Sequence, residues 1–278
     1  MFKRASAWLD RQNLVVQLGV LLGIVFLIRT FLFGLYLVPT GSMETTMLVG
    51  ERFFADKLTP YFKTFKRGEI IAFDAPRFVY STNPAKRMWQ KYVWGPDNWT
   101  KRVIGLPGEH VKGVVENGKP VIYVNGKVLE EPYLNKYPLI GLLVRKGHGA
   151  HERAGVVTKS FDPKIPFDKQ PFYTIDSSDI IPGADGMAYV LWPGTPQSFD
   201  TFDKQLGDDE YWVMGDNRLG SSDSRDWGVL KKEFIHGRIL FRILSVDSQE
   251  GWLLWDIIRH PISFWSRVRK GRNFSMVY

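Results

Sequence analysis

The chain has 278 residues, 44% of them hydrophobic, which is enough for one large or two small domains together with a membrane segment. It contains no cysteine, and this excludes disulfides, thiolate metal sites and cysteine nucleophiles. The formal net charge is +8, with the excess near the termini and in Arg145–Lys169, beside aromatic and apolar segments. The sequence has no nucleic-acid-binding motif. We therefore expect these basic residues to interact with anionic lipid, and we expect no nucleic-acid partner.

The first predicted element is an apolar helix over residues 14–33. Twenty residues make a helix about 30 Å long, which matches the hydrocarbon core of a bilayer. Arg29 lies near the end of this segment, where its side chain can extend to the headgroups. An aromatic belt of Phe31, Phe33 and Tyr36 is expected at the same end of the helix. Trp8 is the aromatic residue expected at the other end.

The orientation of this helix follows from the residues before it, which include Lys3, Arg4 and Arg11. The positive-inside rule predicts that residues 1–13 are cytoplasmic and that everything after Tyr36 is outside. A removable secretory signal would have a shorter apolar core followed by a small-x-small cleavage site. Leu35-Tyr36-Leu37-Val38 offers no such site, so we predict an uncleaved anchor.

The residues from Glu51 onward have a β pattern. Short runs rich in β-branched and aromatic residues are separated by Gly, Pro, Asn or Asp: Glu69–Phe73, Val121–Val124, Ala188–Trp192 and Tyr211–Met214. Asn125-Gly126 is typical of a type I′ hairpin turn, which needs positive φ at both central residues. We therefore predict a mainly β protein, with an N-terminal transmembrane helix followed by an extracytoplasmic all-β domain that contains an inserted subdomain.

Two regions depart from this pattern. Tyr137–Phe172 is rich in Gly, Pro, His and basic residues with little periodicity, which predicts an insertion or long loop. We assign residues 34–110 and 207–250 to a catalytic β core, and residues 111–206 to an inserted β subdomain or long loop.

The C-terminal tail, residues 251–278, has apolar residues near helical spacing, namely Leu254, Ile258, Ile262 and Trp265. Asp256, Arg259 and Pro261 make it a poor second span. Two interpretations remain open: an interfacial helix lying on anionic lipid, and a helix packed on the domain with a disordered basic end.

Three segments combine chemistry-bearing residues. Pro39-Thr40-Gly41-Ser42-Met43 places a serine in a turn just beyond the membrane surface. Lys101 opens the apolar run Lys101–Gly108, and Gly215–Arg225 is a dense loop of Asp, Asn, Ser and Arg. Each segment alone is compatible with an ordinary surface turn or strand, but the combination indicates a catalytic site.

With these segments the chain resembles the bacterial type I signal peptidases (leader peptidases, peptidase family S26), membrane-bound Ser/Lys proteases that remove signal peptides from exported proteins. The similarity includes the anchor running into P-T-G-S-M, the strand Arg67–Phe73, K-R-V-I-G-L-P-G at Lys101–Gly108 and G-D-N-R-L-G-S-S-D-S-R at Gly215–Arg225. These blocks extend from Val38 to Gly228. The resemblance implies a serine endopeptidase of the bacterial inner membrane, single-pass, with its catalytic domain in the periplasm.

The resemblance also implies roles for individual residues. Ser42 would be the nucleophile, Lys101 the general base, and Ser221 the hydroxyl that orients the lysine amine. Asp223 and Arg225 would form an ion pair that holds their loop, and Thr40 would help to form the oxyanion hole. Val38 and Pro39 match part of the substrate-binding edge. An exposed strand edge at Val38–Thr40 or at Trp99–Lys101 could also pair with an extended substrate by β-addition, which makes Trp99 and Thr100 further candidate substrate-binding residues. The substrates implied are signal peptides of preproteins, cleaved after small-x-small sites.

The chain departs from the family pattern directly after Ser42-Met43. The family has a proline and then Thr-Leu two residues on, whereas this chain has Thr45 in place of the proline and Met47 in place of the leucine. The first change removes a fixed φ angle from the turn.

The chemistry itself explains why a lysine must be buried at such a site. A serine hydroxyl needs a base in contact with it, and a lysine with its usual pKa near 10.4 is protonated at neutral pH. Lowering this pKa to about 8 takes roughly 3 kcal/mol, mainly from desolvation. This mechanism requires no cofactor and no metal.

Several alternatives compete with this interpretation. Asp216 and Asp223 suggest a metal site, although the interleaved Arg218 and Arg225 favour a salt-bridged loop. His236 is the candidate base for a Ser-His-Asp arrangement. A self-cleaving repressor-like protein would lack the anchor and carry a DNA-binding domain. A specialised conjugation-type maturation peptidase and an inactive membrane-anchored β binding domain remain open.

Overall fold

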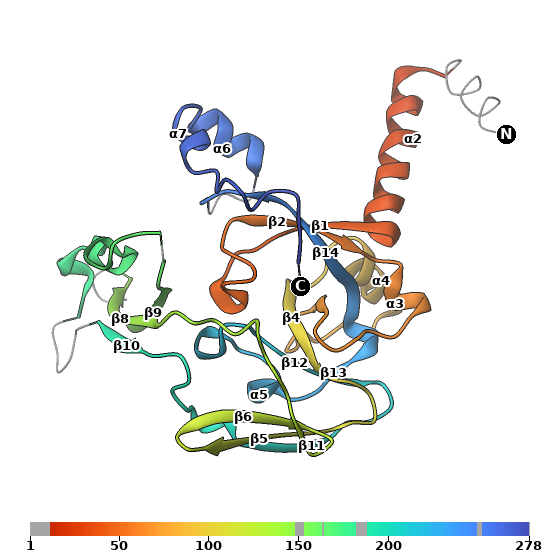
Figure 1. The fold of residues 1–278 in the computed structure, drawn as a ribbon. Helices are drawn as coiled ribbons and strands as arrows, with labels where there is room; N and C mark the ends of the chain where they lie inside the picture. The colour runs from red at the N-terminus through yellow and green to blue at the C-terminus, as the bar shows by residue number, and fades with distance from the viewer. Residues whose placement is uncertain (1–11, 148–152, 163, 182–187, 249–251, 278) are drawn as a thin grey trace.

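The computed structural model describes residues 12–147, 153–162, 164–181, 188–248 and 252–277, which form three antiparallel sheets preceded by one long apolar helix (Figure 1). The residues expected to orient the helix, Lys3, Arg4, Trp8 and Arg11, lie outside this description. The fold is mainly β with an N-terminal apolar helix, as predicted.

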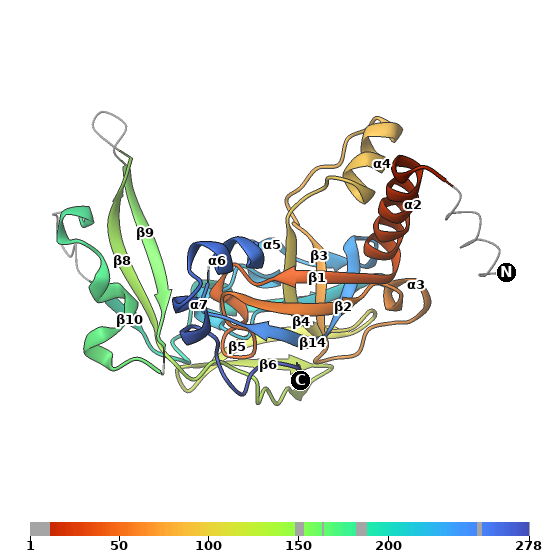
Figure 2. The ribbon, with the colours of Figure 1, turned by 90° about the horizontal axis from the view of Figure 1, so that it is seen from above.

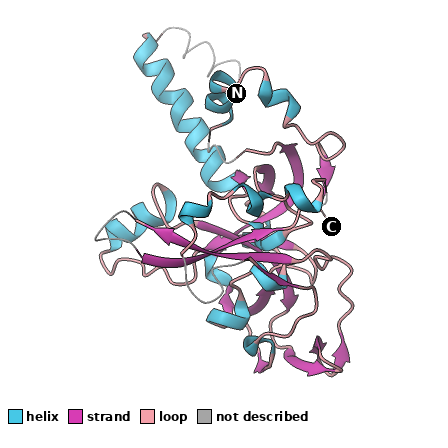
Figure 3. Ribbon diagram, turned by 90° about the vertical axis from the view of Figure 1, so that its left-hand side faces the viewer, coloured by secondary structure: helices cyan, strands magenta, loops and turns pink. Residues whose placement is uncertain are grey.

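The N-terminal helix consists of α2 (Leu14–Leu27) and a π-helical turn, η1 (Ile28–Leu32). Asn13 caps it, because its side-chain oxygen accepts the Val16 N–H at 3.0 Å. None of the apolar residues Leu14–Leu32 is buried inside the protein, and the helix projects away from the sheets (Figure 3). It is therefore long and apolar enough to cross a bilayer.

The helix ends one residue earlier than predicted, because Phe33 pairs with Asp56 as the first residue of a strand. The expected aromatic belt is only partly present. Phe31 and Phe33 are exposed, but Tyr36 is half-buried and packs against the core cluster around Met43.

The main sheet joins the N-terminal and C-terminal parts of the chain. Its strand order is β1 (Phe33–Leu37), β2 (Glu51–Asp56), β14 (Ile235–Ser245), β3 (Ile70–Asp74), β4 (Asn98–Gly105), β12 (Glu210–Met214) and β13 (Leu230–Lys231). A further strand from the C-terminal tail, β15 (Ser275–Met276), pairs with β14. The predicted runs at Glu69–Phe73 and Tyr211–Met214 correspond to β3 and β12.

A second sheet consists of β11 (Phe202–Gln205), β5 (His110–Glu116), β6 (Lys119–Val124) and β7 (Lys127–Val128). Its strand β6 includes the predicted strand at Val121–Val124. Asn125 and Gly126 join β6 to β7 with φ of 49° and 75°, which confirms the predicted type I′ turn.

The third sheet has the order β10 (Tyr189–Leu191), β8 (Leu139–Lys146) and β9 (Arg153–Ser160), and it extends to one side of the molecule (Figure 2). Tyr137–Phe172, for which an insertion or a long loop was predicted, is not a long loop, because β8 and β9 are eight-residue strands within it. The physical reason is local burial: Ile140, Leu142 and Val144 of β8 pack with Phe172.

Short helices connect these strands. They are α3 (Thr59–Phe62), α4 (Pro84–Tyr92) and α5 (Ser224–Trp227), together with the 3-10 turns η2 (Gly41–Met43), η4 (Phe167–Lys169), η5 (Pro171–Thr174), η6 (Ser177–Asp179), η7 (Ser198–Asp200), η8 (Arg218–Gly220) and η9 (Lys232–Phe234). Two of them matter for the site: η2 carries Ser42 and packs against β4, and α5 begins directly after Asp223 and packs against β12.

The C-terminal tail forms α6 (Leu253–Arg259), α7 (Ser263–Ser266) and β15. Arg269 and Arg272 bind the domain, through Asp247 at 3.0 Å and Glu51 at 2.7 Å, whereas Arg267 pairs with Asp256 of α6 within the tail at 2.6 Å. Of the two interpretations of the tail, the one with a disordered basic end does not fit these ion-paired residues. The outer faces of α6 and α7 nevertheless remain apolar and exposed, with Ile258 at 66% and Ile262 at 90%.

Candidate active site

Ser42 lies in a single 3-10 turn, η2, that follows β1. The chain entering this turn is held by Val38, whose N–H donates to Glu51 O at 2.9 Å and whose carbonyl accepts the Gly50 N–H at 2.9 Å. Met43 and Met47 follow the serine in sequence and are buried in the core. Met47 therefore anchors the turn in the protein interior rather than contacting lipid.

Lys101 lies on β4 and is buried, with 4% of its surface exposed. Its Nζ lies 3.0 Å from Ser42 Oγ and 3.2 Å from the Thr100 carbonyl oxygen. The amine also lies 5.4 Å from the centre of the Trp99 ring. Burial lowers the pKa of Lys101 to about 8, although the negative charges of Asp223 and Asp216 act in the opposite direction.

The loop after β12 holds the serine turn from the other side. The Asn217 backbone N–H donates to Ser42 O at 3.1 Å, and the Asn217 side-chain amide donates to Gly41 O at 3.0 Å. Gly215 is required here, because a Cβ at this position would lie 2.2 Å from Ser221 Oγ and 2.5 Å from Ser42 O. The loop and the serine turn are thus in direct backbone contact.

A buried ion-pair network fixes this loop. Arg225 Nε lies 2.8 Å from Asp223 Oδ1, and Arg225 Nη1 lies 2.7 Å from Asp200 Oδ1 on η7. Burial opposes ionisation of Asp223, but the Arg225 guanidinium and the Gly215 N–H outweigh it and hold the pKa of this carboxyl below its usual range. Asp223 consequently stays ionised next to the dyad.

Two of the expected supporting hydroxyls lie near the dyad without contacting it. Ser221 Oγ lies against Gly215 and Asp223, whereas the Lys101 amine bonds to Ser42 Oγ and Thr100 O. Thr40 is exposed, in extended backbone just before η2. Within the described residues its hydroxyl has no hydrogen-bond partner.

The four residues expected at a substrate-binding edge lie beside the dyad. Val38 is buried and Pro39 is exposed, both directly after β1, whereas Trp99 and Thr100 are half-buried on β4. Residues 98–102 of β4 pair with β3 on one side. On the other side β12 pairs only from Arg102 onward, so in the described chain the edge of β4 next to Lys101 is open.

Sequence reasoning predicted the Asp223–Arg225 pair but missed the partner of Asp216 and one contact with the serine turn. Asp216 pairs with Arg102 at 2.6 Å, with both side chains almost completely buried, and also accepts the Thr46 hydroxyl at 2.5 Å. Arg218 was expected to form salt bridges with the aspartates of its own loop, but it pairs with Glu131 instead. Asn217 stood within the quoted motif, but nothing in its spacing indicated a contact with Ser42.

Two alternative sites find no support in this geometry. The carboxylates of Asp216 and Asp223 are occupied by arginines, and the described residues contain no group of three or more His, Cys, Asp or Glu that could hold a metal ion. His236 lies 3.4 Å from Asp74 rather than beside Ser42.

A serine beside a buried lysine on a mainly β scaffold is the arrangement of the Ser/Lys peptidases, a convergent variant of the catalytic triad. Residues 11–244 match the family model described as "Signal peptidase, peptidase S26". The chain therefore belongs to the signal peptidase family, peptidase S26, and is a serine endopeptidase that removes signal peptides.

Individual relatives agree with this assignment. The chain is 30% identical to the signal peptidase I of Bacillus licheniformis, over 78% of this chain and 80% of that protein. It is 29% identical to the signal peptidase I of Bacillus amyloliquefaciens, over 86% and 89%, and 28% identical to the probable signal peptidase I-2 of Synechocystis sp., over 87% and 75%. A solved structure, the signal peptidase I of Enterococcus faecalis V583, has 22% identity and a TM-score of 0.29, and covers 63% of this chain and 97% of that one.

Proposed function

We propose that this signal peptidase cleaves preproteins after small-x-small sites with Ser42 as nucleophile and Lys101 as general base. The observation that carries the proposal is the buried Lys101 amine, 3.0 Å from Ser42 Oγ and with a pKa lowered to about 8. An amine with this pKa is neutral in a useful fraction of molecules near neutral pH, and it touches the hydroxyl it must deprotonate.

The reaction then runs in two halves. Ser42 Oγ attacks the scissile carbonyl carbon while its proton passes to Lys101 Nζ, and the lysine gives this proton to the departing amine of the mature protein. The signal peptide stays on Ser42 as an ester. Water then attacks the ester, with Lys101 again taking a proton and returning it to Ser42 Oγ. No cofactor takes part in these steps.

Thr40 is positioned to stabilise the tetrahedral intermediates. Its hydroxyl is exposed two residues before the nucleophile and free of partners in the described chain, so it is available to donate to the oxyanion together with the Ser42 N–H. One such donor is typically worth about 3 kcal/mol of transition-state stabilisation. In this proposal Ser221 and the Asp223–Arg225 pair support the dyad through their loop.

The open edge of β4 is the proposed binding site for the extended substrate. A chain pairing with residues 98–101 by β-addition would bring its carbonyl past Lys101 and Ser42, with Val38 and Pro39 on its other side. Alternate side chains of the substrate would point toward the protein, and this periodicity suits recognition of two small residues separated by one.

We place the enzyme in the bacterial cytoplasmic membrane, as a single-pass protein with a cytoplasmic N-terminus and a periplasmic catalytic domain. The apolar helix ends at Leu32, so the nucleophile lies only ten residues beyond it. The exposed apolar faces of α6 and α7 lie on the side of the main sheet from which α2 projects (Figure 1), which suits contact with membrane lipid.

Cleavage of a preprotein with a small-x-small site tests the reaction and its specificity. We expect the wild-type chain in liposomes to release a product whose N-terminus begins directly after that site, and the Ser42→Ala variant to release none. Cleavage at another position would contradict the proposed specificity. Cleavage by Ser42→Ala would contradict the nucleophile.

A further inference from the structure

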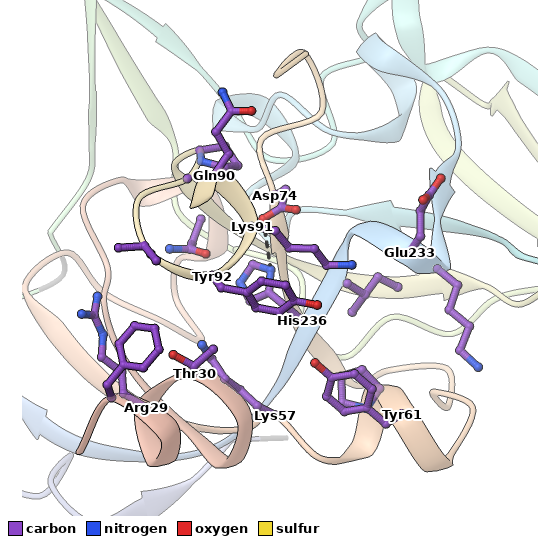
Figure 4. Close-up of a pocket in the computed structure, with 18 of the residues that line it drawn as sticks. Arg29, Thr30, Lys57, Tyr61, Asp74, Gln90, Lys91, Tyr92, Glu233 and His236 are labelled. Carbon is purple, nitrogen blue, oxygen red and sulfur yellow. Dashed lines mark ion pairs between the residues drawn. The ribbon is translucent and has the colours of Figure 1, made fainter. Parts of the chain in front are cut away.

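A cavity of about 550 Å³ opens beside the foot of the anchor, away from Ser42 (Figure 4). The end of the apolar helix forms one wall through Phe26, Arg29 and Thr30, and the end of α4 forms another. Lys57, just after β2, and His236, on β14, lie at its base. Its volume is within the range of small-molecule sites, roughly 300–1,000 Å³.

Unpaired cations characterise the anchor side of this cavity. Within the described chain neither Arg29 nor Lys57 forms an ion pair or a side-chain hydrogen bond, and Lys91 and Lys232 add two further amines to the lining. Burial and the neighbouring Arg29 charge lower the pKa of Lys57, although the negative charge of Asp74 acts in the opposite direction. Two like charges held close together in a half-buried site favour an anion between them.

The carboxylates of the lining offset this charge only in part. Asp74 is already engaged, with His236 at 3.4 Å and with the Tyr80 hydroxyl at 2.6 Å. Glu233 lies at the end of the cavity opposite Arg29 (Figure 4), and Asp209 also contributes to the lining. The Arg29 and Lys57 end therefore remains positive.

The position of the cavity indicates where its ligand would come from. Phe26 and Arg29 belong to the last turns of the membrane helix, so the cavity faces the headgroup layer. Phe31 at the foot of the helix contacts Tyr92 of α4, with ring centres 5.7 Å apart. Tyr61 of the lining is exposed, and so are three aromatic residues next in sequence to lining residues, as is usual at a membrane interface: Phe62, Trp89 and Trp94.

We propose that this cavity binds the phosphate of an anionic phospholipid headgroup, with Arg29 and Lys57 as its main contacts and Lys91 as a third. The site is distinct from the Ser42–Lys101 site and rests only on the membrane anchorage of the chain. The phosphodiester would lie between the guanidinium and the amine, while the acyl chains run along the apolar face of the anchor.

Thermal unfolding of the full-length chain in phosphatidylcholine-containing detergent micelles tests this site. All proteins carry Ser42→Ala, so that the shift of the unfolding midpoint reports lipid binding and does not depend on catalysis. Phosphatidylglycerol is titrated into the micelles, and the concentration at half the maximal rise in the unfolding midpoint is compared between proteins. We expect Lys57→Gln to need about tenfold more of this lipid, because it loses one charge-assisted contact.

Three comparisons sharpen the result. Lys57→Arg keeps the charge and should match the parent protein, as should Lys127→Gln on the distant, exposed strand β7. Lys91→Gln, on the surface of α4, gives a second variant that does not touch the buried part of the cavity, and it should also weaken binding. Without phosphatidylglycerol, Lys57→Gln should unfold at the same or a higher temperature than the parent, because it removes an unpaired, half-buried charge.

The outcomes that overturn the proposal are equally specific. Equal half-saturation for Lys57→Gln and Lys127→Gln would mean diffuse attraction to an anionic surface. Inorganic phosphate, tested at the same concentrations, should leave the midpoint unchanged. If it reproduced the rise in the parent protein but not in Lys57→Gln, the ligand would be free phosphate rather than a lipid.

Discussion

Lys101 and Arg102 are adjacent on β4, and their contacts explain why the pKa of Lys101 is lowered whereas Arg102 forms a buried ion pair. Lys101 points to Ser42, and no carboxylate lies within ion-pair distance in the described chain, so desolvation dominates its pKa. Arg102 points to the opposite face, where its Nε and Nη2 donate to the two carboxylate oxygens of Asp216 at 2.8 and 2.6 Å. Alternation of side chains along a strand therefore separates catalysis from structure within two residues.

Breaking the Arg102–Asp216 pair is predicted to destabilise the protein strongly. The Arg102→Met variant leaves a buried carboxylate without its main partner, and such a loss typically costs about 3–5 kcal/mol of unfolding free energy. The matched control is Arg77→Met, which removes an exposed pair with Asp226, and the expected cost there is below about 1 kcal/mol. Urea unfolding in detergent measures both, and equal stabilities would contradict the structural role of the buried pair.

Residue roles could be predicted from the sequence where the interacting residues lie within one short motif, and not where the partners are far apart in the chain. Ser42, Lys101 and the Asp223–Arg225 pair stood out because the motifs that contain them are local. The Arg102–Asp216 pair joins residues 114 positions apart, and several arginines in the sequence were equally plausible partners. Only the register of β4 against β12 selects Arg102.

Among the elements, the C-terminal tail has the least expected role. Arg272 Nη2 donates to the carbonyls of Thr45 and Thr46 at 3.2 and 3.3 Å, and Arg242 Nη2 donates to the Thr46 carbonyl at 2.7 Å. Both arginines also bind the buried Glu51. The turn after Ser42, which lacks the proline of the family pattern, is thus held by side chains from β14 and the tail.

Arg272→Ala is predicted to cost about 1–3 kcal/mol of unfolding free energy, because Glu51 and two backbone carbonyls lose a charged donor. It should also lower kcat, since the serine turn loses part of its support. Lys270→Ala is the matched control, because Lys270 is an exposed cation two residues earlier. Denaturation and preprotein cleavage measure the two effects, and indistinguishable variants would show that the tail does not support the turn.

The elements that could be predicted were those with a strong local signal. The Asn125-Gly126 turn and the runs that became β3, β6, β10 and β12 were evident from residue type. The pairing of β8 with β9 was missed because Gly, His and basic residues in the sequence between the two runs conceal the apolar run that begins at Leu139. Its strand character depends on pairing with β9 and β10, which the local sequence does not encode.

At the scale of the whole molecule, the apolar helix and the exposed apolar residues of the tail lie on the same side of the main sheet (Figure 1), and we propose that this side faces the membrane. Ser42, the proposed nucleophile, lies close to this side because β1 leads directly from the helix to η2. The substrate, which emerges from the same bilayer, would reach the open edge of β4 without leaving the surface.

The absence of cysteine allows a direct test of this orientation. Ile262→Cys and Lys127→Cys can each be labelled with a fluorescent maleimide in the full-length chain, reconstituted in vesicles containing brominated lipid. We expect strong quenching of the dye at position 262, on the apolar face of the tail, and little at position 127, on the second sheet. Equally weak quenching at both positions would mean that the tail does not contact the bilayer.

The measurement that tests the central claim most directly is the pH dependence of kcat/KM for preprotein cleavage. Because Lys101 must be neutral to accept the Ser42 proton and its pKa lies at about 8, activity should rise about tenfold per pH unit below that value and level off above it. Lys101→Arg, which retains the positive charge but stays protonated throughout, should abolish cleavage while the protein remains folded and inserted in the membrane. A flat profile across pH 7–9, or substantial activity in Lys101→Arg, would contradict the Ser42–Lys101 dyad.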